Sequence, residues 1–223
     1  MMSINRLSKL TGIGYLIIFI TGFYSNFFVL EGLVVPNNVE LTINNILNND
    51  FLFRSGILGF IIMVLADLIL AWSLYLILKS VNENLSLLTA WLRLVNAAIF
   101  GVALFKLIEV LQLINHTNSA AHFQEHILLS LNAFNNIWLI GLTFFGVHLV
   151  LLGTLIYKSG FIPKVIGILL MIAGIGYLVD STAHFMLSNY ENYKDVFSAV
   201  VLLPGIVGEL SFTVWLLIKQ VKA

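Results

Sequence analysis

Residues 56–78 read GILGFIIMVLADLILAWSLYLIL, and the only charged side chain among them is Asp67. A helix needs roughly 20 mostly apolar residues to cross the hydrocarbon core of a membrane, and this stretch is long enough. Backbone N–H and C=O groups must be satisfied within the segment in lipid, which favours an α-helix. The stretch therefore predicts a transmembrane helix that carries one carboxylate inside the bilayer.

Five further apolar runs of similar length occupy most of the remaining chain: 10–30, 87–114, 127–157, 165–187 and 196–218. The whole sequence is 60% hydrophobic and 10% charged, whereas a soluble domain usually has about 25% charged residues. No polar linker separates two classes of composition. We therefore predict an all-α fold, with residues 1–223 forming a single domain of about six transmembrane helices.

The longest connection, 31–53, has a pattern of its own. Val39, Ile43, Ile46 and Leu47 fall on one helical face, which predicts a short helix lying on the membrane surface. The polar residues 48–50 that follow it are suited to cap the second transmembrane helix.

Basic residues are divided unevenly between the two ends of the predicted helices. One side collects Arg6, Lys9, Lys79, Arg93, Lys158, Lys164, Lys219 and Lys222, and the other has Arg54 and Lys194, with Lys106 buried nearer to it. The side richer in Lys and Arg is normally cytoplasmic, so both termini are expected inside. The first run is longer than a signal-peptide core and no A-x-A site follows, so we expect a retained helix.

Composition also excludes several classes of function. The formal net charge is zero with 11 basic and 11 acidic residues, so no basic block favours nucleic acid. There is no cysteine, which excludes disulfides, thiolate metal sites and thiol catalysis. Nucleotide-binding glycine motifs are absent. We expect the lipid bilayer as the main partner, no cofactor and no tightly bound metal, and the sequence leaves a homo-oligomer open.

Charged and polar side chains inside the predicted spans fall into two groups by depth. The inner group is Asp67, Arg93 and Glu209, joined by His148 if its helix turns that way. Each of the three charges shares a helical face with small residues, and such faces pack against other helices. Two readings stay open: an ion-pair network in which Arg93 neutralises the carboxylates, or a site for a polar substrate or a proton relay.

The outer group suggests a metal site as an alternative. Asp180 and His184 lie four residues apart, as do His122 and His126, and both pairs have a spacing that can hold zinc. Arg54, Lys106, Glu109 and His116 are expected nearby. However, no H-E-x-x-H motif occurs, and the pairs lie on different helices. A haem between His148 and His184 is disfavoured, because their depths differ by roughly 15 Å at helical rise.

One short sequence occurs twice. Residues 12–16 read GIGYL and residues 174–178 read GIGYL again, in two helices expected to run outward. The match indicates either an internal repeat, as in many transporters, or coincidence in a sequence rich in these residues. We expect Tyr15 and Tyr177 to pack between helices.

Five motifs in order give the sequence a resemblance to a known family. They are Asn48–Gly56, Leu74–Leu78, Ala90–Leu94, Ser159–Gly167 and, at the end, Glu209 with Trp215–Leu217. Together they resemble the bacterial membrane-protein family catalogued as domain of unknown function 4386, over nearly the whole chain. The resemblance implies a multi-pass protein of the bacterial cytoplasmic membrane and no particular activity. It touches Arg54, Arg93 and Glu209.

Three functions are therefore weighed. The first is a membrane protein that binds or moves a small molecule or ion through a polar intramembrane cavity, with Asp67, Arg93, Glu209, His148 and Arg54 as ligand-binding residues. The second is a non-catalytic interaction or structural subunit, whose charges hold the bundle together. The third is a membrane-embedded, metal-dependent hydrolase, which requires Asp180 and His184 to meet His122 or His126.

The distribution of basic residues generates a testable topology. A cysteine placed at position 160, between the fourth and fifth spans, should be labelled only after the membrane is permeabilised, because that loop is predicted to be cytoplasmic. The natural chain has no cysteine, so the signal has no background. Labelling by an impermeant maleimide in intact cells would contradict the orientation.

Overall fold

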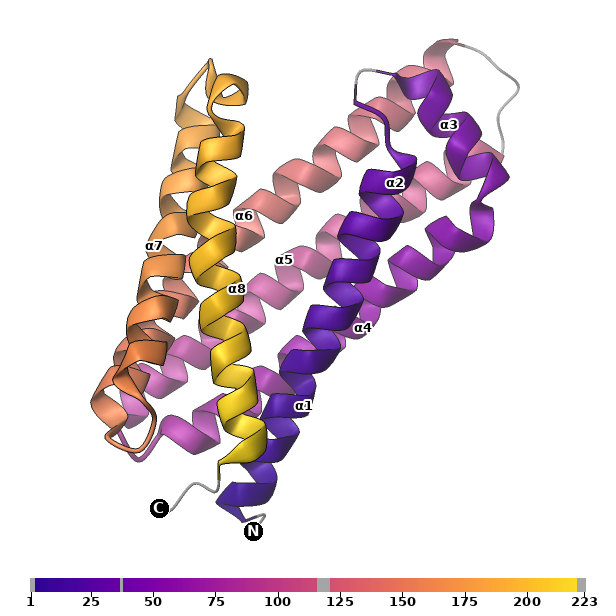
Figure 1. The fold of residues 1–223 in the computed structure, drawn as a ribbon. Coiled ribbons are helices and arrows are strands. Elements are labelled where there is room, and N and C mark those ends of the chain that lie inside the picture. Colours follow the sequence, from indigo (N-terminus) through magenta and orange to yellow (C-terminus); the bar gives the residue numbers. More distant parts are fainter. Residues whose placement is uncertain (1–2, 37, 116–120, 220–223) are drawn as a thin grey trace. The chain divides into compact units, whose positions relative to one another are not determined.

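A computed structural model describes residues 3–36, 38–115 and 121–219, and within these ranges the chain is helical and has no strand. In chain order (Figure 1) the elements are α1 (Ile4–Phe23), the π-helix η1 (Tyr24–Leu30), α2 (Glu31–Leu33), α3 (Val39–Asn48), α4 (Asp50–Leu78), α5 (Glu83–Asn115), α6 (Ala121–Ser159), α7 (Lys164–Met186), the 3₁₀ turn η2 (Tyr190–Asn192) and α8 (Lys194–Ile218).

Among the described residues, six helical segments are long and apolar enough to cross a membrane, which confirms the all-α, six-span prediction. The first of them runs without a break through α1, η1 and α2, from Ile4 to Leu33. Most helices extend a few residues past the predicted apolar runs, because polar residues at the membrane surface continue the helical hydrogen bonding. The inside position of the termini stays a prediction.

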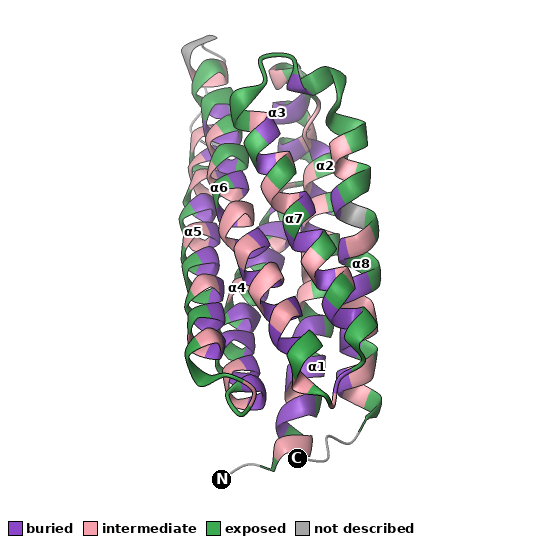
Figure 2. Cartoon of the chain, turned by 90° about the vertical axis from the view of Figure 1, so that its left-hand side faces the viewer, coloured by how far each residue is buried: buried purple, intermediate pink, exposed green. Residues whose placement is uncertain are grey.

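Large apolar side chains are exposed on all six spans, as lipid requires. Figure 2 shows the exposed residues as patches along the helices, beside buried ones. Examples are Ile20, Leu58, Phe105, Leu129, Val165 and Leu203. In water such surfaces would drive aggregation, whereas in a bilayer they face acyl chains at no cost.

The described residues pack as two compact units. Unit 1 comprises the chain up to Leu16, Ala66–Ala97 and the chain from Leu139 onward, and unit 2 comprises Ile17–Leu65 and Ala98–Trp138. The boundaries fall inside α1, α4, α5 and α6 and not at a linker. That the whole chain acts as one domain stays a prediction.

Glycines allow the helices of unit 1 to approach closely. A Cβ on Gly146 in α6 would lie 2.9 Å from the Gly174 carbonyl oxygen in α7, and Gly153 and Gly167 meet in the same way two turns further on. On the other side, α7 packs along α8 (Figure 1). There Pro204 lacks an N–H for the Val200 carbonyl, and Gly176 of α7 lies against that carbonyl oxygen.

The first and last spans are joined within the same unit. Ser8 of α1 donates a hydrogen bond of 2.9 Å to the Leu216 carbonyl of α8, and a Cβ on Gly12 would lie 2.7 Å from Leu217. These contacts place the α1 residues that follow, including Tyr15, beside the middle of α8. This arrangement brings together the polar side chains described below.

Unit 2 contains the predicted short helix and an unpredicted π-helix. The helix predicted around residues 39–47 is α3, capped by Asn38 and with Ile43 and Ile46 buried, while Leu47 is exposed. In η1, the Tyr24 hydroxyl lies 2.6 Å from Ser55 Oγ of α4. Nothing in the apolar run 10–30 indicates the wider helical turn. Phe60, Phe100, Phe134 and Trp138 form an aromatic group in this unit.

The turn after α6 has one residue in left-handed conformation. Gly160 has a φ of 73°, a region that costs a residue with a side chain roughly 1–2 kcal/mol. Lys158 is exposed in the last turn of α6, two residues before Gly160, so it is the less strained position for a labelling cysteine.

Candidate functional site

Arg93 is the largest fully buried side chain in the described structure, with 1% of its surface exposed. It pairs with Asp67, itself 3% exposed, through a contact of 2.6 Å between Nη2 and Oδ1. Asp67 lies eleven residues before the end of α4 and Arg93 ten residues after the start of α5. Because α4 and α5 are joined by a short turn, equal distances from it put the two charges at one depth. The predicted pairing is confirmed.

His148 of α6 contacts Nη1 of Arg93, the terminal nitrogen that does not contact Asp67. Arg93 Nη1 lies 3.1 Å from His148 Nε2, and His148 Nδ1 lies 2.8 Å from the Thr89 carbonyl oxygen. A guanidinium can only donate hydrogen bonds, so Nε2 accepts and Nδ1 carries the proton. The geometry thus assigns a neutral imidazole in one tautomer, which links α5 to α6 at the level of the ion pair.

Aromatic rings enclose the remaining faces of Arg93. Its guanidinium carbon lies 5.2 Å from the centre of the Tyr15 ring and 5.7 Å from that of Phe145, within the range of cation–π attraction. The Tyr15 hydroxyl is also 3.5 Å from Nη1. Tyr15 meets Phe212 of α8 edge-on, and Phe145 meets Tyr177 of α7 in the same manner. Every one of the six spans therefore supplies a side chain to this cluster.

Glu209 belongs to the cluster by charge but not by an ion pair. It is half-buried on α8, one helical turn before Phe212, whose ring meets that of Tyr15. Within the described part of the chain, no basic side chain lies within 4.0 Å of its carboxylate. Arg93 therefore pairs with one of the two carboxylates predicted for it, and Glu209 keeps an unbalanced charge.

Several buried polar atoms have unused hydrogen-bonding capacity. Among the residues described, Arg93 Nε and both amide atoms of Asn96 have no hydrogen-bond partner. Asn96 is 1% exposed and lies one turn after Arg93 on the same face of α5. A buried polar group left without a partner costs about 1–3 kcal/mol. These atoms offer two donors and one acceptor to a small polar guest.

The remaining predicted residues lie elsewhere. Arg54 belongs to unit 2, where it forms an exposed ion pair of 2.7 Å with Asp50, and its part in ligand binding stays a prediction. Lys106 and Glu109 pair at 2.8 Å in the same unit. In unit 1, Asp180 accepts a 2.6 Å hydrogen bond from the Tyr190 hydroxyl, and burial and that carboxylate raise the pKa of Tyr190.

The metal hypothesis gains no support from the histidines. The ring of His184 packs edge-on against Tyr190, with ring centres 4.6 Å apart. In the portions of the chain that are described, no three His, Asp or Glu side chains gather as a metal site. His116 and the side chain of His122 lie outside the described residues. The predicted set of Asp180, His184, His122 and His126 is therefore not tested in full.

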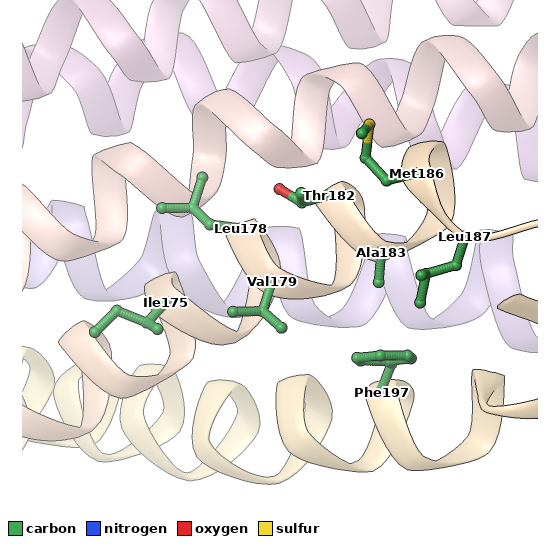
Figure 3. A pocket seen from close by; sticks show the side chains of 8 residues that line it. All are labelled: Ile175, Leu178, Val179, Thr182, Ala183, Met186, Leu187 and Phe197. Carbon is green, nitrogen blue, oxygen red and sulfur yellow. The ribbon is translucent and has the colours of Figure 1, made fainter.

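A pocket of about 430 Å³ lies between α7 and α8 (Figure 3). Leu178, Thr182, Met186 and Phe197 are among the residues that line it, and Thr182 brings the polar atom visible in the close-up. None of Asp67, Arg93 and Glu209 borders this pocket. Its apolar lining fits an acyl chain from the surrounding lipid better than a polar ligand.

Sequence reasoning missed two ring partners of Arg93, Phe145 and Tyr15, and the Thr89 acceptor of its neighbour His148. Thr89 acts through its backbone carbonyl, which no side-chain pattern reveals. The repeated GIGYL was the one available signal, because both of its tyrosines lie around the cluster, Tyr15 against Arg93 and Tyr177 against Phe145.

A double-mutant cycle tests the buried ion pair. Arg93→Met or Asp67→Asn alone should lower the free energy of unfolding by about 3–5 kcal/mol, because each leaves an uncompensated buried charge. The double variant should recover about 0.5–3 kcal/mol relative to additivity. Unfolding by SDS in mixed micelles gives the measurement. The exposed pair Asp50–Arg54 is the matched control, with an expected coupling of about 0.2–1 kcal/mol. Additive effects at Asp67 and Arg93 would contradict the pairing.

Comparison with known proteins agrees with this architecture. An uncharacterised protein of the archaeon Archaeoglobus fulgidus is 35% identical over 167 residues, which cover 75% of this chain and 85% of that protein. Its relatives are therefore not confined to bacteria. No solved structure matches the chain. The model of the family described as Domain of unknown function (DUF4386) matches residues 10–219. The protein accordingly belongs to the DUF4386 family, as its five motifs predicted.

Proposed function

We propose that this multi-pass membrane protein binds a small polar molecule or ion within the bilayer, at the cluster around Arg93. One observation carries the proposal: six spans converge on a buried guanidinium beside polar atoms with no protein partner. We place the protein in the cytoplasmic membrane of a bacterium, and its six long apolar helices support a multi-pass membrane location. Ionisable groups at such depth commonly mark binding and transport sites.

A purely structural role does not account for the whole cluster. Asp67 and Arg93 alone would fix the register of α4 and α5, and His148 would add α6. Neither Asn96 nor Glu209 is needed for that purpose, and each adds an energetic cost in lipid. A bound molecule that hydrogen-bonds the Asn96 amide and Arg93 Nε would offset this cost.

The alternative is a non-catalytic subunit in which the cluster only fixes the register of the helices. We call this role a register lock. The observation that favours it is the continuous chain of contacts from Asp67 through Arg93 and His148 to the Thr89 carbonyl. Buried ion pairs of this kind can specify a fold without binding anything. The two readings differ in what Asn96 does, so the decisive variant is at that position.

Acetate and acetamide are suitable probes, because they present the carboxylate and amide groups that Arg93 Nε and Asn96 could bind. In nanodiscs, at least one should raise the unfolding midpoint of the natural protein, since a ligand at 100 times its Kd adds about 2.7 kcal/mol. Asn96→Leu should abolish the response. Gln112→Leu, an exposed change on the same helix, should keep it.

Two results would reject ligand binding in favour of the register lock. The first is that neither probe stabilises the natural protein. The second is that Asn96→Leu responds to the probe as the natural protein does. Asn96→Leu would then act only on stability, which it would increase because it removes an unpartnered buried amide.

A further inference from the structure

The charges in the cluster do not sum to zero. Asp67 and Glu209 bring two carboxylates, and Arg93 brings one positive charge that an arginine cannot lose. His148 adds none, because its ring accepts from Arg93 and donates to Thr89. One negative charge is therefore left inside the membrane, where an unbalanced charge is costly.

We infer that Glu209 takes up one exchangeable proton, so that the binding site alternates between a neutral and a singly negative state. This inference rests on the proposed function and names its coupling group. The step is a simple protonation: a carboxylate oxygen of Glu209 gains a proton from a hydronium ion, which becomes water, so one O–H bond forms and one breaks. No oxidant, reductant or further reactant takes part.

Asp67 is not the group that exchanges the proton. Its carboxylate is fully buried and held at 2.6 Å by Arg93, so protonating it would break the ion pair and leave the guanidinium unbalanced. Glu209 has no such partner among the described residues, and it is only half-buried. A proton can bind to it and can leave without breaking an ion pair.

The charged and titratable groups of the cluster are compatible with a proton on Glu209. Tyr15 from α1 and Tyr177 from α7 contribute neutral hydroxyls, while Asp67 from α4 and Arg93 from α5 contribute a balanced pair. His148 from α6 contributes a neutral ring. A metal cation fits less well, because it would need several oxygen ligands beside the positive charge of Arg93.

Protonation changes what the site can bind. With Glu209 neutral, Arg93 and Asn96 face a guest without a second negative charge beside them, and the new O–H is a hydrogen-bond donor. With Glu209 charged, an anionic guest is repelled. A ligand such as acetate should therefore bind together with a proton, which is the behaviour expected of a proton-coupled site.

Infrared spectroscopy in nanodiscs tests the inference directly. As the pH rises, the C=O stretch of one protonated carboxylic acid should disappear, and this band should be missing at every pH in Glu209→Gln. Glu109→Gln removes a carboxylate that is ion-paired in unit 2, and it should leave the band intact. If Glu209→Gln does not fold, Glu209→Asp should retain the band at a shifted frequency.

Three outcomes would overturn the inference: no titrating band in the natural protein, a band that survives in Glu209→Gln, or a band removed by sodium ions at constant pH, which would indicate a cation site. Asn96→Leu separates this inference from the proposed function. A variant that keeps the band and loses the acetate response shows two separable properties. Loss of the band while acetate still binds contradicts proton uptake and leaves the proposed function in place.

Discussion

The ion pair between Arg93 and Asp67 is the interaction on which the rest of the structure depends. A guanidinium that is 1% exposed cannot remain inside a membrane protein without a carboxylate and further acceptors. Asp67 of α4 and His148 of α6 meet that requirement, and the Thr89 carbonyl of α5 accepts the Nδ1 proton that leaves His148 Nε2 free to accept from Arg93. The aromatic rings of Tyr15 and Phe145 then exclude water from its faces and connect the pair to α7 and α8.

Backbone packing makes this convergence possible. Glycines in α6 and α7 allow these helices to lie in contact, and the Ser8–Leu216 hydrogen bond fixes α1 beside α8. These close approaches bring Tyr177 against Phe145 and Phe212 against Tyr15, next to the two rings that cover the guanidinium. The small residues therefore serve the polar cluster as well as the packing of helices in lipid.

The sequence predicted the parts of this structure that depend on length and depth. Apolar runs located the six spans, and depth along the helices put Asp67 and Arg93 in one inner group. It could not predict lateral distances between helices that are not consecutive, so it placed Glu209 in the same ion-pair network, whereas the structure leaves that carboxylate without a basic partner. The backbone acceptor of Thr89 and the π-helix at Tyr24–Leu30 have no recognisable pattern of side chains.

The central claim is that Arg93 donates to a neutral His148 at the meeting point of the six spans. Solid-state ¹⁵N spectroscopy of histidine-labelled protein in lipid, with His148 assigned from the signal lost in His148→Gln, measures this most directly. The account predicts a ring protonated at Nδ1 alone, with an Nε2 resonance that shifts in Arg93→Met. A ring protonated at Nε2, or at both nitrogens, would contradict it, because Arg93 would then have no acceptor there.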